Sequence, residues 1–167
     1  MIISEGCSMP APYHGGCLCG LIRYRLTDEP LTLYACHCTD CQRRTGSAFA
    51  LSMPVFKSGL DLLKGEPRTY AVTLSDGRQK HGTFCGECGT RLWGEPPKFP
   101  QVVVVQPGTL DDTTWLQPIG HIWTRSAQPW ISIPKDTVNF EGQPEDPMVL
   151  INAWRDRSRL SRPPARG

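Results

Sequence analysis

Seven of the eight cysteines in this chain lie in three short clusters, and their spacing constrains the fold more than any other feature. The clusters are a C-x-C pair at Cys17 and Cys19, a C-x-C-x-x-C run at Cys36, Cys38 and Cys41, and a C-x-x-C pair at Cys85 and Cys88. Two cysteines separated by one residue are badly placed to form a disulfide with each other. Thiolates on tight, glycine-rich turns can instead share one metal ion, so the spacing indicates zinc binding.

The number of clustered cysteines indicates two zinc sites of different kinds. Seven ligands divide naturally into four and three. A closed four-cysteine site is structural, whereas three protein ligands leave a position for water or substrate. Three alternatives stay open for the smaller site: His37 completes it, an acidic residue such as Asp40 completes it, or it is empty. Cys7 lies outside every cluster, and we expect it to bind no metal.

The spacing allows two groupings of the clusters. Sequence neighbours would combine Cys17 and Cys19 with part of the second cluster, which leaves Cys41 with the distant third cluster. The simpler grouping keeps the second cluster intact as the three-ligand site. Cys17 and Cys19 then meet Cys85 and Cys88, and their shared ion connects the first strand region to the middle of the chain.

Charge and hydropathy exclude several classes of protein. The formal net charge of +2 is too small to indicate a nucleic-acid partner. No apolar run approaches the roughly 18–20 residues that cross a bilayer, and the mean hydropathy is −0.33. The first residues lack the basic region and apolar stretch of a secretory signal. We therefore expect a cytoplasmic protein, with reduced thiols and with neither a nucleic-acid nor a membrane partner.

The 16 glycines and 16 prolines favour a mainly β fold rich in turns over a helical bundle. Four consecutive valines, Val102 to Val105, predict a strand buried on both faces. A polar segment from Thr39 to Arg44 predicts a short helical turn capped by Thr39. The last core strand is expected at residues 119–124, and Pro147 opens a C-terminal helix over residues 147–160. Further strands are expected at residues 21–27, 31–36, 48–54, 61–65, 68–74, 79–85 and 90–95.

The chain resembles the glutathione-dependent formaldehyde-activating enzyme family, which shares its domain with centromere protein V. The resemblance is carried by the segments GGCLCGLIRYRL, ACHCTDCQRRTGSAFA, GTFCGECGTRLW and GTLDDTTWLQPIGHIWTRSAQPW. It covers residues 15–141, which leaves a flexible N-terminal segment at residues 1–14 and a C-terminal extension at residues 142–167, helical and then basic. It implies the zinc-binding Mss4-like fold, built from several small, coiled antiparallel sheets.

The resemblance also implies roles for the cysteines and a reaction. Two zinc ions per chain are expected: a structural zinc on Cys17, Cys19, Cys85 and Cys88, and a catalytic zinc on Cys36, Cys38 and Cys41. The family's named reaction joins glutathione and formaldehyde to S-(hydroxymethyl)glutathione, formally as a carbon–sulfur lyase. We therefore expect an enzyme that acts on thiol adducts of small aldehydes, with a small thiol such as glutathione and an aldehyde as its partners. The alternative is a non-catalytic, zinc-stabilised binding module.

Three further residues lie in or next to the second cysteine cluster and are candidates for a role at its metal site. His37 lies between two ligands, so we expect its side chain to point away from the metal in a structural role. Arg43 and Arg44 follow the second cluster directly. They are either ordinary surface cations or partners for the carboxylates of glutathione, which favour a guanidinium group.

Overall fold

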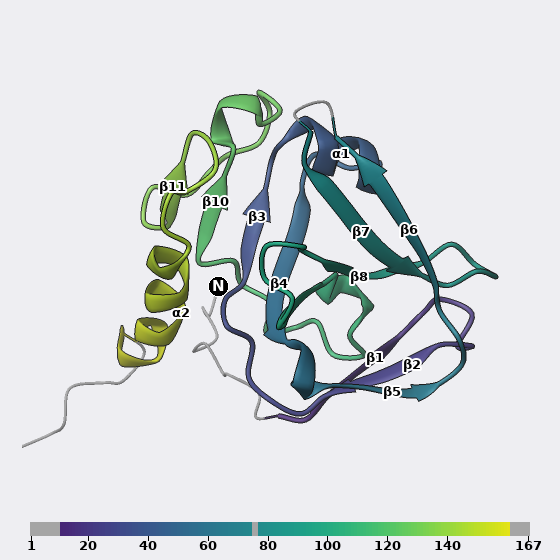
Figure 1. Cartoon of the computed structure of the whole chain (residues 1–167). Coiled ribbons are helices and arrows are strands. Elements are labelled where there is room, and N and C mark those ends of the chain that lie inside the picture. Colours follow the sequence, from purple (N-terminus) through teal and green to yellow (C-terminus); the bar gives the residue numbers. More distant parts are fainter. Residues whose placement is uncertain (1–10, 75–76, 161–167) are drawn as a thin grey trace, which may run out of the picture.

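The computed structural model describes residues 11–74 and 77–160, and it confirms a mainly β fold with a C-terminal helix (Figure 1). Within these residues the chain forms eleven β-strands and two α-helices. The helices are α1 (Thr39–Thr45) and α2 (Met148–Leu160), and single turns of 3-10 helix lie at Lys57–Gly59, Pro107–Thr109 and Thr124–Ser126. Residues 1–10 of the expected N-terminal segment and residues 161–167 of the basic tail lie outside the described part.

The strands form two sheets. The smaller sheet has the order β1-β2-β5, with β1 at Tyr13–Gly16, β2 at Arg23–Leu26 and β5 at Leu60–Lys64. The larger sheet has the order β11-β10-β3-β4-β9-β8-β7-β6. Its strands are β3 (Tyr34–Cys36), β4 (Ala50–Phe56), β6 (Arg68–Thr73), β7 (Gln79–Phe84), β8 (Arg91–Glu95), β9 (Val102–Val105), β10 (Gly120–Ile122) and β11 (Val138–Phe140). In Figure 1 the smaller sheet lies at the bottom, and α1 lies at the opposite end of the molecule.

One edge of the larger sheet departs from the antiparallel arrangement that we expected. Strand β10 pairs in parallel with both β3 and β11. Parallel neighbours need a long crossover connection, and the chain between β3 and β10 is long enough to supply it. The last core strand is also not the one expected, because β11 follows β10 and covers its outer edge.

The valines of β9 alternate between the core and the surface. Val103 and Val105 are buried, whereas Val102 and Val104 are half-exposed. The expectation that this strand is buried on both faces is therefore wrong, because an antiparallel sheet commonly has one face on the core and one toward solvent. Strand β2 follows the same rule, with Tyr24 and Leu26 fully buried between half-exposed arginines.

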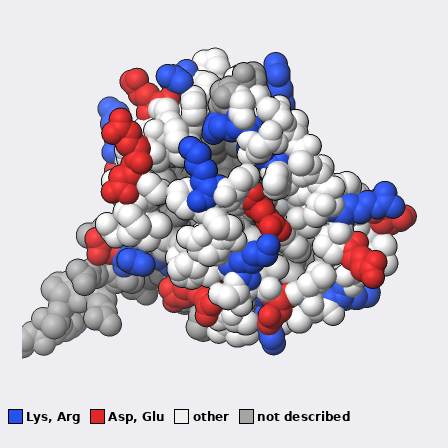
Figure 2. Space-filling model, in the orientation of Figure 1, with Lys and Arg blue, Asp and Glu red and all other residues white. Residues whose placement is uncertain are grey.

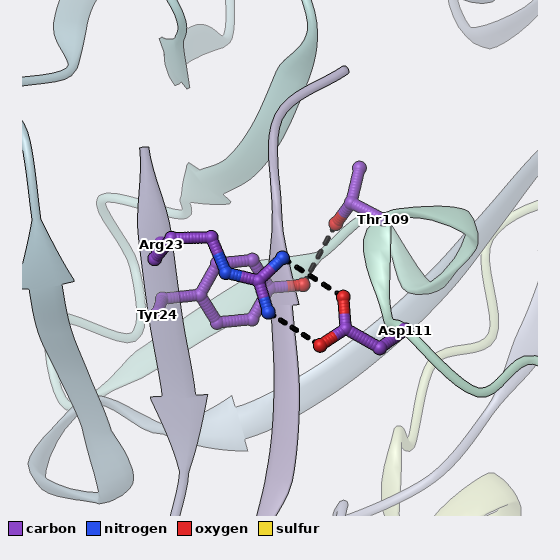
Figure 3. A network of polar contacts seen from close by, with 4 residues as sticks. All are labelled: Arg23, Tyr24, Thr109 and Asp111. Carbon is purple, nitrogen blue, oxygen red and sulfur yellow. Dashed lines mark hydrogen bonds and ion pairs between the residues drawn. The ribbon is translucent and has the colours of Figure 1, made fainter. Parts of the chain in front are cut away.

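A small polar network joins the smaller sheet to the segment that follows β9 (Figure 3). The Thr109 hydroxyl donates to the Gln106 carbonyl at 2.7 Å, so its oxygen accepts the hydrogen bond from the Tyr24 hydroxyl, also at 2.7 Å. Beside it, the Arg23 guanidinium binds both carboxylate oxygens of Asp111. Burial raises the pKa of Tyr24 to about 12, which keeps the phenol a neutral donor. The network thus holds the first cysteine turn, just before β2, against the rest of the fold.

The two ends of the described chain are both packed into the structure. Strand β1 begins at Tyr13, which is buried, so ordered structure starts within the segment expected to be flexible up to residue 14. At the other end, α2 buries Leu150 and Trp154 against the core, and the Thr32 hydroxyl donates to the Leu150 carbonyl at 3.0 Å. No helix in the described residues is long and apolar enough to cross a membrane.

Candidate metal centres

The first and third cysteine clusters meet in the folded chain. The sulfur atoms of Cys17, Cys19, Cys85 and Cys88 all lie within 4.8 Å of one another, and we call this group the four-sulfur cluster. The Cys19 and Cys85 sulfurs are 3.7 Å apart although 66 residues separate them in sequence. The structure therefore brings together the four cysteines of the simpler grouping, and it joins the turn before β2 to the turn between β7 and β8.

Both turns curl around the sulfur atoms in the same way. The Gly20 amide donates to the Cys17 carbonyl at 3.0 Å, and the Gly89 amide donates to the Cys85 carbonyl at 2.9 Å. Each glycine has a positive φ, +74° and +71°, which a residue with a side chain rarely adopts. The Ile22 amide then donates to the Cys17 sulfur at 3.2 Å. Amides aimed at sulfur stabilise a thiolate, as a metal ligand requires.

The second cysteine cluster forms a separate group. The sulfur atoms of Cys36, Cys38 and Cys41 lie within 4.8 Å of one another, and we call this group the three-sulfur cluster. Cys36 ends β3, and Cys41 lies in the first turn of α1. Helix α1 is capped by the sulfur of Cys38, which accepts the Cys41 amide at 3.4 Å. The expected cap, Thr39, is instead the first residue of the helix, because the sulfur satisfies the amide that a hydroxyl would otherwise accept.

The distances within both clusters suit a tetrahedral metal–thiolate site. Four sulfur atoms at about 2.3 Å from one zinc ion lie about 3.8 Å from each other. The neighbouring sulfurs in the structure are 3.4 to 3.7 Å apart, far longer than a disulfide bond, and all seven cysteines are free thiols. Both clusters could therefore hold a metal ion.

The pKa values of the thiols also favour metal binding. Hydrogen bonds from the Cys36 and Cys38 thiols lower the pKa of Cys41 to about 2; burial opposes this shift, and the positive charges of Lys80 and Arg44 add to it. In the four-sulfur cluster, hydrogen bonds from Thr90 lower the pKa of Cys88 to about 5. Each cluster thus holds at least one sulfur readily as a thiolate, the form that binds metal.

The three-sulfur cluster gains no fourth ligand from the described residues. Neither His37 nor Asp40, the two candidates from the sequence, places a ligand atom in the group. The His37 ring is fully buried. It stacks on His121, with its Nε2 2.9 Å from Nδ1 of His121, and the Phe49 ring lies tilted against it. Burial lowers the pKa of both histidines, so the pair is neutral and holds the end of β3 to β10.

A glutamine that the sequence analysis missed fixes the position of α1. The Gln42 amide group donates to the His37 carbonyl at 2.7 Å and to the Ser126 carbonyl at 2.8 Å. Its oxygen accepts from the Gln128 side chain at 2.7 Å. These bonds tie the helix that carries Cys41 to the segment after β10. No signal in the sequence could have found the bonds to Ser126 and Gln128, because these partners lie more than 80 residues away.

The two arginines after the second cluster differ in position. The Arg43 side chain is exposed on the outer side of α1. The Arg44 side chain is half-buried, and its Nη2 lies 4.0 Å from the Cys41 sulfur. Only Arg44 is therefore placed to act at the three-sulfur cluster.

Comparison with known proteins gives one family. Residues 12–126 match the model of the family described as glutathione-dependent formaldehyde-activating enzyme. A protein of Halomonas elongata, provisionally named as such an enzyme, is 24% identical over 150 residues, which cover 86% of this chain and 94% of that protein. A crystal structure of a Rhodobacter sphaeroides protein is similar at 19% identity, with a TM-score of 0.48, over 76% of this chain and 98% of that one.

Proposed function

Because the chain belongs to the glutathione-dependent formaldehyde-activating enzyme family, we propose that it joins a thiol to formaldehyde at a zinc ion held by the three-sulfur cluster. The thiol is glutathione, the product is S-(hydroxymethyl)glutathione, and the reaction belongs to the carbon–sulfur lyase class. A second zinc ion, on the four-sulfur cluster, has a structural role. Both sites need reduced cysteines, which supports a cytoplasmic location.

The difference between the two clusters carries this proposal. The four-sulfur cluster supplies a complete tetrahedral set, so an ion there has no position for substrate. The three-sulfur cluster supplies three ligands, with no fourth from the described residues. A zinc ion bound there would accept one further thiol and hold it as a thiolate near neutral pH.

The residues around the three-sulfur cluster supply position and charge for the reaction. Cys36, Cys38 and Cys41 fix the place of the incoming sulfur, and the hydrogen bonds of Gln42 fix α1 beneath it. In the reaction the substrate sulfur attacks the carbonyl carbon and forms the C–S bond. The carbonyl π electrons move to oxygen, which takes the proton that the thiol has lost. Formaldehyde is already a strong electrophile, so bringing the two reactants together supplies much of the acceleration.

Cobalt substitution tests the proposal, because the visible absorption of Co²⁺ reports its sulfur ligands. We expect two metal ions per chain, and glutathione should change the absorption of one of them only. The exchange of ¹³C-formaldehyde with its glutathione adduct, followed by NMR, should be faster with the zinc protein than without it. Cys38→Ser should stay folded, lose one metal ion and lose both responses.

The opposite result would favour a different function. If the absorption of both cobalt ions ignores glutathione and exchange is not accelerated, the three-sulfur cluster has no position for a thiol substrate. The chain would then be a metal-stabilised binding module.

A further inference from the structure

Three cations from separate parts of the chain lie near the three-sulfur cluster, and one of them, Arg44, contacts the Cys41 sulfur. Arg44 Nη2 lies 4.0 Å from that sulfur. Arg91, the first residue of β8, donates from Nη1 to the Arg44 carbonyl. Lys80, on β7, lies close enough for its charge to lower the pKa of Cys41. We call Arg44, Lys80 and Arg91 the cationic cluster.

The register of the larger sheet explains the neighbours of these side chains. Lys80 and Gly82 are two residues apart on β7, so they lie on the same side of the strand. Gly82 pairs directly with Tyr70, so the Tyr70 side chain lies on that side as well. Phe84 pairs with Arg91 just after a shift of register between Thr83 and Phe84, which places Arg91 at the end of the same two strands.

The Tyr70 side chain packs beside the cationic cluster. The Tyr70 ring lies across Gly82, where an added Cβ would come within 2.4 Å of the ring. Burial lowers the pKa of the Arg91 guanidinium, and Tyr70 lies close enough to Arg91 to raise that pKa in opposition. Arg91 itself is held toward α1 by the hydrogen bond that it donates to the Arg44 carbonyl.

The positive charge of this cluster has no carboxylate partner in the described part of the chain. The ion pairs that join Arg23 to Asp111, Arg25 to Asp61 and Lys57 to Glu95 include no residue of the cluster. The Nε atom of Arg44 is buried and has no hydrogen-bond partner. Burial and the nearby Arg44 both lower the pKa of Arg91, as expected of a cation held among cations.

An anionic metal site does not balance this charge. Three thiolates with one divalent ion carry a single negative charge, which leaves two positive charges of the cationic cluster uncompensated. A thiolate substrate would compensate one of them. A carboxylate on the same substrate would compensate the other and supply acceptors for the guanidinium groups. Figure 2 shows a hollow in the upper part of the molecule with Lys and Arg side chains at its edge.

We infer that Arg44, Lys80 and Arg91 form a carboxylate-binding site that selects thiols carrying a carboxylate near the sulfur. The inference rests on the proposed function, since it assumes that a thiol binds at the three-sulfur cluster. It goes further by predicting that neutral thiols of the same length bind weakly. The carboxylate lies on the side of the cluster facing β7 and β8, and α1 contributes only Arg44.

The test compares two thiols of the same chain length, one ending in a carboxylate and the other in a neutral hydroxyl group. Binding of 3-mercaptopropionate and of 3-mercapto-1-propanol to the cobalt-loaded protein is measured by visible absorption. We expect the carboxylate thiol to bind about tenfold more tightly, because hydrogen bonds to a charged group are worth at least that factor. Arg91→Gln should reduce the preference to less than about threefold, mainly by weakening 3-mercaptopropionate. Arg43→Gln is the matched control, because Arg43 is an exposed arginine of α1 next to Arg44. This variant should keep the preference.

Two further variants keep the test decisive. Arg91→Lys retains the charge and should retain most of the preference. A low metal content would reveal that Arg91→Gln fails to fold. In that case Lys80→Gln, which changes a half-exposed strand residue, still tests the inference and should lower the preference.

Equal binding of the two thiols by the unchanged protein would overturn the inference and leave the proposed function intact. Equal weakening of both thiols in Arg91→Gln would also overturn it, because that result indicates a structural role. If neither thiol changes the absorption, the proposed function fails and the inference fails with it.

Discussion

Removing one ligand from each sulfur cluster should destabilise the protein unequally. We compare Cys88→Ser with Cys38→Ser, because both cysteines are half-exposed and both sulfurs take part in a hydrogen bond that serine can keep. Serine is a poor zinc ligand, so each variant loses one metal-mediated cross-link. The cross-links differ mainly in the length of chain that they close.

The magnitude follows from the loop lengths. The four-sulfur cluster joins Cys19 to Cys85 across 66 residues, whereas the three-sulfur cluster closes a loop of only a few residues, from Cys36 to Cys41. By the chain-entropy relation for cross-links, the long loop is worth about 4 kcal/mol and the short loop about 2 kcal/mol. Cys88→Ser should thus cost about 2 kcal/mol more than Cys38→Ser. For a chain of this size, that difference corresponds to about 4–8 °C in Tm.

The assay is thermal unfolding followed by circular dichroism, at a free zinc concentration fixed by a chelator. Fixing free zinc matters because a ligand that binds only the folded state raises Tm by mass action. Metal analysis of each variant must show the loss of one zinc ion. The reasoning would be refuted if Cys38→Ser, having lost one zinc, lowered Tm as much as Cys88→Ser does.

Four other substitutions have definite expected outcomes. Cys7→Ser should leave the zinc content unchanged, and the loss of about one zinc per chain would show that the ligand sets are misassigned. Tyr24→Phe should lower the free energy of unfolding by about 1 kcal/mol in urea, because it removes the hydrogen bond to Thr109 alone. Gln42→Leu removes three hydrogen bonds of α1 and should cost about 2–3 kcal/mol, with thiol binding to the cobalt protein weakened in parallel. Trp154→Ala should cost about 3–5 kcal/mol, and a change below about 1 kcal/mol would show that α2 contributes little to the core.

The cysteine spacing predicted the two sulfur clusters because it needs only local geometry and a ligand count. Cysteines two or three residues apart can readily share one metal ion. Seven such ligands can be divided between two sites in only a few ways. The same logic found the short helix at Thr39, since a polar segment beside the sulfurs has few other conformations. Its cap was misjudged because a cysteine sulfur rarely takes the role that a threonine hydroxyl usually has.

Features that depend on pairing between distant strands could not be predicted in this way. The parallel pairing of β10 with β3 brings His121 to His37, and it is set by a crossover that no short pattern records. Arg91 meets the Arg44 carbonyl only because of the way β8 pairs with β7 in the larger sheet. Arg91 did carry one signal, because it lies three residues after Cys88 and so close to a metal-binding turn.

The C-terminal elements, β11 at the edge of the larger sheet and α2 on the core, bear on where this protein can be cut. The family match ends at residue 126, but β10 receives its outer partner from β11, and Trp154 of α2 lies in the main core. A chain shortened to residue 126 would keep every clustered cysteine and still expose a bare strand edge beside an uncovered apolar surface. Such edges pair with other chains. In this chain the matched segment is therefore shorter than the sequence that folds, and expression of that segment alone should give aggregates that bind zinc.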